Sequence, residues 1–85
     1  MTFTYKTNGV CSRFIDIEIE DDILVSVKYT GGCNGNLQGI SRLVKGMKID
    51  EVIEKLENIK CGFKDTSCPA QLALALKEYN KTKGD

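Results

Sequence analysis

The first third of the chain alternates hydrophobic and polar residues with a period of two, which is the pattern of β-strands with one buried face. The alternation runs through residues 2–6, 15–20 and 23–29. The apolar sets are Phe3 and Tyr5 in the first run, Ile15, Ile17 and Ile19 in the second, and Ile23, Val25, Val27 and Tyr29 in the third. Because only the acidic residues 20–22 separate the last two runs, we predict a three-stranded antiparallel meander.

After Gly31-Gly32 the apolar residues recur at helical spacing, and three helices are expected. Their apolar faces are Leu37, Ile40, Leu43, Val44 and Met47 in the first, Val52, Ile53 and Leu56 in the second, and Leu72, Ala73, Leu76 and Tyr79 in the third. Asn34 or Asn36 is the expected cap of the first helix, Gly46 its end, and Asp50 the cap of the second. Strands followed by helices predict an α+β fold, with about three helices on one face of the meander.

With 85 residues the chain is expected to form a single domain, residues 1–85. It carries 12 Lys and Arg against 12 Asp and Glu, so no positive surface for nucleic acid is expected. No apolar run is long enough to span a membrane, and the first residues lack the apolar core of a secretory signal. We therefore expect a cytoplasmic protein.

Four cysteines and no histidine are the main chemical feature of the sequence. Cys11 and Cys33 flank the predicted hairpin, so its two strands should bring them together, whereas Cys61 lies in a loop-like stretch and Cys68 precedes Pro69. We predict that all four share one metal site; buried inert thiols are the alternative. The spacing matches no zinc-finger or ribbon pattern, but sulfur ligands alone favour zinc or an iron–sulfur cluster.

The predicted helix starts add a second chemical argument. Since Pro favours the first helical position, we expect Cys68 to be the N-cap of the last helix and Gln71 its capping-box partner. Helix starts favour thiolates, which bind metals and also act as redox nucleophiles, and this makes Cys68 a redox candidate. Cys61, in the loop-like stretch before it, is the second redox candidate. Arg13, Asn34 and Asn36 are candidate contacts for an anion. Without histidine, a Ser-His or Cys-His hydrolase site is excluded.

Two motifs resemble a known family. Residues 66–69, Thr-Ser-Cys-Pro, which follow residues 31–36, Gly-Gly-Cys-Asn-Gly-Asn, resemble the TSCPD domain family, and the resemblance extends from about Gly9 to Leu76. Members of that family occur alone or at the C-terminus of cobalamin-dependent ribonucleotide reductases. The resemblance implies an accessory role in ribonucleotide reduction, with a ribonucleotide reductase or a redox protein as partner. Ala70 stands where the family has the Asp of its name.

A second resemblance is to iron–sulfur cluster scaffold proteins and their zinc-bearing sulfur-acceptor relatives. They share the positions of Cys11, Cys33 and Cys68 and a segment like residues 44–51, and their fold is also a meander backed by helices. The sequence departs from them at Ser67, where scaffolds have histidine, and at Ser12. This resemblance implies an iron–sulfur or sulfur carrier as the alternative function. A structural-zinc interaction module is the third.

Overall fold

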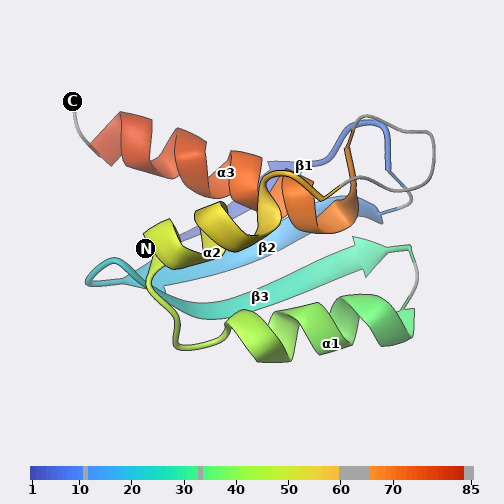
Figure 1. Ribbon diagram of the computed structural model, residues 1–85, viewed down its shortest axis with the longest axis horizontal. Helices are drawn as coiled ribbons and strands as arrows, with labels where there is room; N and C mark the ends of the chain where they lie inside the picture. Colours follow the sequence, from blue (N-terminus) through green and yellow to red (C-terminus); the bar gives the residue numbers. More distant parts are fainter. Residues whose placement is uncertain (11, 33, 60–65, 84–85) are drawn as a thin grey trace.

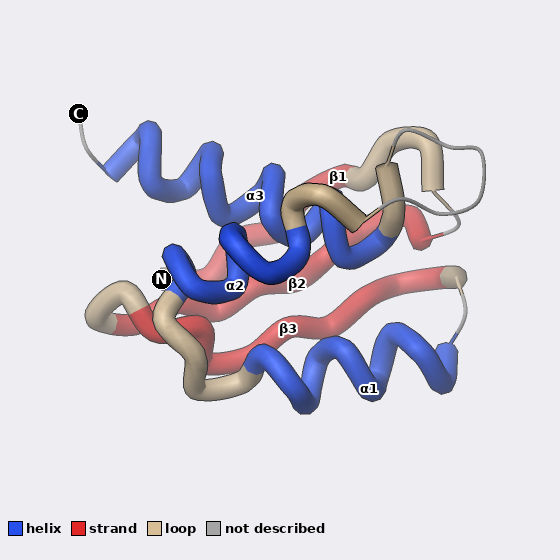
Figure 2. Tube along the Cα trace, in the orientation of Figure 1, coloured by secondary structure: helices blue, strands red, loops and turns tan. Residues whose placement is uncertain are grey.

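The computed structural model describes residues 1–10, 12–32, 34–59 and 66–83. In chain order the elements are β1 (Thr2–Lys6), β2 (Ser12–Glu20), β3 (Ile23–Gly31), α1 (Asn34–Val44), α2 (Ile49–Leu56) and α3 (Cys68–Lys83) (Figure 1). The strands form one antiparallel sheet in the order β1-β2-β3, with the helices after it in sequence (Figure 2). The predicted α+β fold, its meander and its three helices are confirmed. No helix in these ranges is long and apolar enough to cross a bilayer.

A two-residue turn joins β2 to β3. Glu20 pairs with Ile23, and the residues between them, Asp21 and Asp22, have φ angles of 53° and 64°. Positive φ at both central positions is the geometry of the type I′ turn, whose twist matches that of the two strands. Asp tolerates this conformation better than most residues other than Gly and Asn. The acidic segment therefore closes the hairpin as its sequence predicts.

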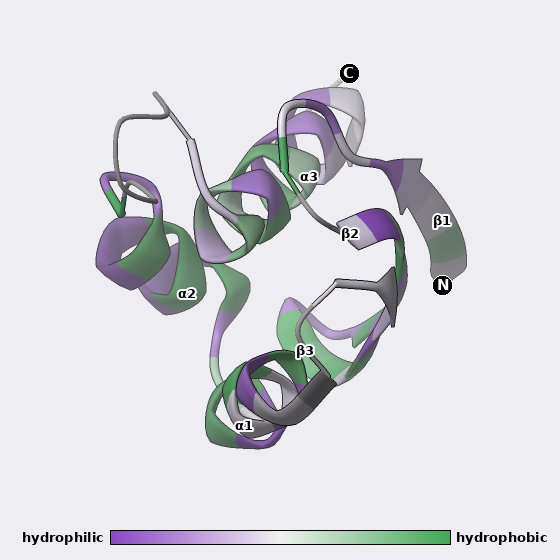
Figure 3. Ribbon diagram, turned by 90° about the vertical axis from the view of Figure 1, so that its right-hand side faces the viewer, coloured by the Kyte–Doolittle hydropathy of each residue, from purple (hydrophilic) through white to green (hydrophobic). Residues whose placement is uncertain are grey.

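The helices form a layer against the sheet, with α2 and α3 over one face and α1 alongside β3 (Figures 1 and 3). The link between α1 and α2 pairs with the start of β3, since the Leu24 N–H donates to the Met47 carbonyl and the Gly46 N–H to the Leu24 carbonyl, both at 2.8 Å. Gly46 has a φ of +85°, a conformation that favours glycine and ends α1 as expected. This pairing fixes α1 next to β3.

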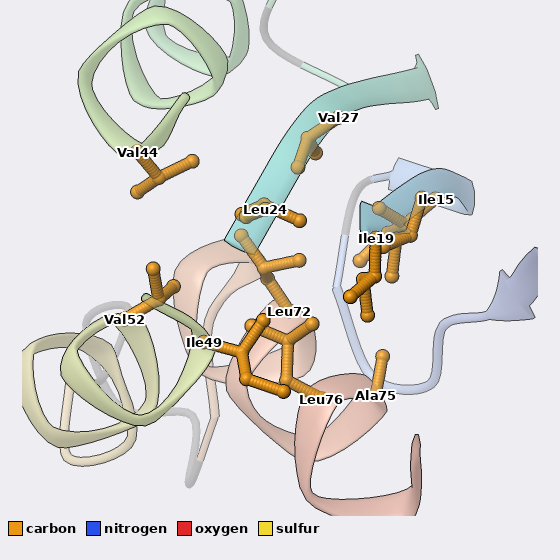
Figure 4. Close-up of a cluster of buried hydrophobic side chains, with 11 residues drawn as sticks. Ile15, Ile19, Leu24, Val27, Val44, Ile49, Val52, Leu72, Ala75 and Leu76 are labelled. Carbon is orange, nitrogen blue, oxygen red and sulfur yellow. The ribbon is translucent and has the colours of Figure 1, made fainter. Parts of the chain in front are cut away.

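One hydrophobic core lies between the sheet and the helices (Figure 4). Its fully buried large side chains are Ile15, Ile17, Ile19, Leu24, Ile49, Val52, Leu72 and Leu76. Leu37 and Val44 are the buried residues of α1, whereas Leu43 is 79 % exposed. The prediction that Leu43 belongs to the buried face is wrong, because adjacent helical residues point about 100° apart and Val44 already faces the core.

A register shift corrects the predicted face of β3. Glu18 pairs with Ser26 but Ile19 pairs with Leu24, so Val25 is an extra residue on β3. Such a bulge reverses the alternation beyond it. Leu24 is consequently fully buried together with Val27, whereas Val25 is only half-buried. The expectation that Val25 shares the buried face of Val27 is wrong for this reason.

A second shift occurs at the start of β2. Ser12 pairs with Gly31 and Phe14 with Thr30, which leaves Arg13 as the extra residue. In a regular strand Ser12 would face away from the side of Ile15, because the two residues are three positions apart. With the bulge, both are buried, Ser12 at 4 % and Ile15 at 0 % exposure. Ser12 therefore points toward the helices.

The N-cap of α3 is Ser67 rather than Cys68. The Ser67 carbonyl accepts the first helical hydrogen bond from the Gln71 N–H, and the Ser67 hydroxyl accepts one from the Ala70 N–H at 3.1 Å. A hydroxyl is the better cap for an exposed backbone N–H group, so the helix begins one residue earlier than expected, with Cys68 as its first residue. In α2 the cap is Lys48, and the predicted cap Asp50 lies in the first turn.

We predict that Ser67→Ala lowers the free energy of unfolding by about 1–3 kcal/mol. The variant loses the cap and leaves the Ile59 carbonyl without the Ser67 hydroxyl, which donates to it at 2.6 Å. Thermal and urea unfolding of the parent and the variant measure the difference. Ser41→Ala is the control, because the Ser41 hydroxyl bonds only a carbonyl of its own helix, that of Leu37. Equal stability of the two variants would contradict the role given to Ser67.

Candidate metal centre at the start of α3

Cys68 lies at the first position of α3 and is 8 % exposed. Its sulfur is 3.2 Å from the Ser12 Oγ, a distance at which either atom can donate a hydrogen bond to the other. The backbone of Ser12 is held in turn by Thr7, whose hydroxyl donates to the Ser12 carbonyl at 2.6 Å. The bulge at Arg13 thus brings β2 against the thiol of Cys68.

Tyr29 connects β3 to the same helix turn. Its hydroxyl donates a hydrogen bond to the Cys68 carbonyl at 3.0 Å. Burial raises the pKa of Tyr29 above its ordinary value, and the nearby Cys68 sulfur, when charged, adds to this effect. The phenol therefore stays protonated and keeps donating to the helix throughout the physiological pH range.

Gln71 holds the loop after β1 against the start of α3. Its side-chain nitrogen donates to the Thr66 hydroxyl at 3.0 Å, and its side-chain oxygen accepts from the Asn8 N–H at 3.1 Å. Gln71 is 4 % exposed, so these bonds satisfy a buried amide. The predicted capping-box role of Gln71 is replaced by this link between two segments that are distant in the sequence.

The predicted shared site includes Cys11, Cys33 and Cys61, which lie outside the described residues. Only the positions of their described sequence neighbours therefore bear on it. Ser12, which follows Cys11, contacts Cys68 directly, and Ser12 pairs with Gly31, two residues before Cys33. Ile59, two residues before Cys61, accepts a hydrogen bond from the Ser67 hydroxyl. Described neighbours of Cys11 and Cys61 thus contact the start of α3, and a described neighbour of Cys33 pairs with one of them. Within the described ranges, no three His, Cys, Asp or Glu side chains form a group suited to a metal ion.

The three candidate anion contacts lie on two elements, β2 and α1. Arg13 is exposed at the bulge of β2, and its carbonyl accepts the Thr7 N–H at 3.0 Å. Asn34 is the first residue of α1, and Asn36 is exposed inside that helix, so Asn36 is not its cap. Anion binding by these residues stays a prediction.

The arrangement can supply a buried sulfur donor fixed at a helix start. The thiol of Cys68 is shielded, its main chain is held by Tyr29, and its neighbour Ser12 is in place before any ligand arrives. Sequence reasoning identified Cys68 but missed Ser12 and Tyr29 as its contacts. No periodic signal reveals Ser12, because its direction depends on the bulge.

The similarity of this chain to a known protein family extends over nearly the whole fold. The family model described as TSCPD domain matches residues 3–80. No curated protein and no solved structure gives a significant match. The match includes the three strands except Thr2, the three helices except the end of α3, and the residues around Cys68. The chain therefore belongs to the TSCPD domain family.

Proposed function

We propose that the chain is a zinc-binding accessory domain of ribonucleotide reduction, with Cys11, Cys33, Cys61 and Cys68 as the ligands. One observation supports the metal site. Described neighbours of the other three cysteines contact the first turn of α3 or pair with a residue that does. Cys68 itself belongs to that turn. A single chain can gather four ligands only where such segments meet.

The donor set fits zinc. The chain has four cysteines and no histidine, and four thiolates form a closed tetrahedral site of the structural kind. Cys68 is already buried, which suits a site closed to solvent. The same donors also suit an iron–sulfur cluster, and this is the basis of the alternative carrier function. A metal site with no role beyond stability, in a domain that only binds a partner, is the third candidate.

The resemblance to the family supports the role in ribonucleotide reduction. TSCPD domains occur alone or at the C-terminus of cobalamin-dependent reductases, so a ribonucleotide reductase or one of its redox proteins is the proposed partner. A domain with one small core has no room for a radical cofactor together with a nucleotide, so the role is accessory. We assign it to the cytoplasm, where reducing conditions keep cysteines available as ligands.

Protein purified without chelator is expected to be colourless and to contain about one zinc per chain, by elemental analysis, as one four-ligand site requires. Structural zinc contributes on the order of 10 kcal/mol, comparable with the whole stability of a small domain. Cys33→Ser should therefore lose zinc and melt far below the parent. Ser12→Ala, which keeps all four thiols, should keep its zinc. A brown protein containing iron would favour the carrier function. A Cys33→Ser variant that melts like the parent in zinc-replete buffer would reject the site.

Alkylation separates a closed site from a redox relay. With Cys68 only 8 % exposed, we expect all four cysteines to resist iodoacetamide until chelator is added and then to react together. Timed mass spectrometry of the digested protein follows each cysteine. Early, selective modification of Cys68 or Cys61 with zinc still bound, together with a reversible disulfide, would instead show that these residues deliver reducing equivalents.

The partner is tested directly. The zinc-loaded domain should co-elute with the ribonucleotide reductase of its own organism in size-exclusion chromatography and change its rate of deoxynucleotide formation with dithiol reductant. Cys33→Ser should do neither, and Ser12→Ala should do both. If the zinc-loaded domain leaves elution and rate unchanged, the assignment to ribonucleotide reduction is wrong even where the zinc site is correct.

A further inference from the structure

A groove of about 480 Å³ runs between β3 and α1, and of the described contacts of Cys68 it includes Tyr29. β3 forms one wall of the groove, from Ser26 to Gly31. One face of α1 forms the other wall, from Leu37 to the residues just past the end of the helix. In Figure 2 the two elements run side by side along the lower border of the molecule. An edge strand paired with a helix is a recurrent frame for binding extended peptides.

The strand wall offers backbone hydrogen bonds. In the described sheet β3 has β2 as its only strand neighbour, and the link after α1 pairs with β3 only at its start, at Ile23 and Leu24. Every second residue of an antiparallel strand turns its N–H and C=O to the same side, so an edge strand presents unpaired groups to an added strand. Six residues of β3 are long enough, at about 20 Å, for a segment of five or six residues.

The groove also carries a one-sided charge. Lys28 lies on the strand wall, and Arg42 and Lys45 lie one turn apart on the helix wall. No Asp or Glu is among the described residues that line it, although the chain as a whole has no net charge. Asp16 pairs with Lys28 across the sheet, but its carboxylate accepts a hydrogen bond from the Thr4 hydroxyl. Carboxylates are the groups that this groove complements.

We propose that the groove binds an extended acidic segment of a partner protein, which adds as a fourth strand to β3 and places its carboxylates near Lys28, Arg42 and Lys45. Val27, Tyr29 and Leu37 supply the apolar floor for the alternate side chains of the segment. The cations are distributed along two walls, which suits a row of carboxylates better than a single phosphate. This surface goes beyond the metal site and does not require it.

The probe is a fluorescein-labelled, end-capped heptapeptide that alternates Val and Glu, measured by fluorescence anisotropy with the zinc-loaded protein at 0.15 M salt. We expect saturable binding, lost at least tenfold in the Arg42→Glu/Lys45→Glu double variant. The control double variant Lys55→Glu/Lys81→Glu makes the same charge change on exposed residues outside the groove and should change affinity less than twofold. The melting temperature and zinc content of each variant show whether weaker peptide binding reflects a change in the groove or a loss of the fold or of the zinc.

Two further peptides test the mode of binding. The peptide with Lys in place of Glu should not bind, and the acidic peptide with every second amide N-methylated should bind at least tenfold more weakly, because it cannot complete the strand pairing. Equal affinity for both double variants, or for the methylated peptide, would overturn the proposal. So would displacement of the peptide by equimolar ATP, which indicates a nucleotide site, or a dimer that the Arg42→Glu/Lys45→Glu change dissociates, which indicates a second copy as occupant.

Discussion

The first turn of α3 is the constraint on which the surrounding structure depends. Ser67 caps the helix and bonds the Ile59 carbonyl, Cys68 meets Ser12 of β2, and Gln71 holds the loop after β1. The bonds of Cys68 and Gln71 join residues that are 56 and 63 positions apart, so these two must offset the entropy of closing a long loop. Because they share one helical turn, the position of that turn is fixed from several directions at once. A metal bound there would add to a frame that the protein already has.

The strands and helices could be predicted from the sequence because burial imposes a period on it. Ile15, Ile17 and Ile19 follow the two-residue period, and all three are buried. The period fails where one residue is inserted: at Val25, which moves Leu24 into the core, and at Arg13, which turns Ser12 toward the helices. A bulge changes the register without changing the type of residue needed in the strand, so hydrophobicity alone does not reveal it.

The sequence was sufficient to predict Cys68 as a residue of the candidate site, but it did not reveal which residues contact Cys68. A cysteine before proline indicated a helix start correctly, but the choice of cap between Ser67 and Cys68 depended on which side chain reaches the Ala70 N–H. The role of Tyr29 has a similar origin. Its sequence position indicates a strand residue, whereas its hydroxyl bonds the Cys68 carbonyl, which lies 39 positions further along the chain. Contacts between elements depend on the packing angle, which local sequence does not specify.

Tyr29 also relates the start of α3 to the groove. It is among the residues lining the groove between β3 and α1, and its hydroxyl bonds the first residue of α3. A segment added to β3 would therefore contact the same residue that holds the main chain of Cys68. Any shift of Tyr29 on binding would change the hydrogen bond to that turn, and, by linkage, any change at the turn would alter binding in the groove. If the groove binds a segment and the turn holds a metal, as proposed, the two events are coupled through Tyr29, because its side chain belongs to both.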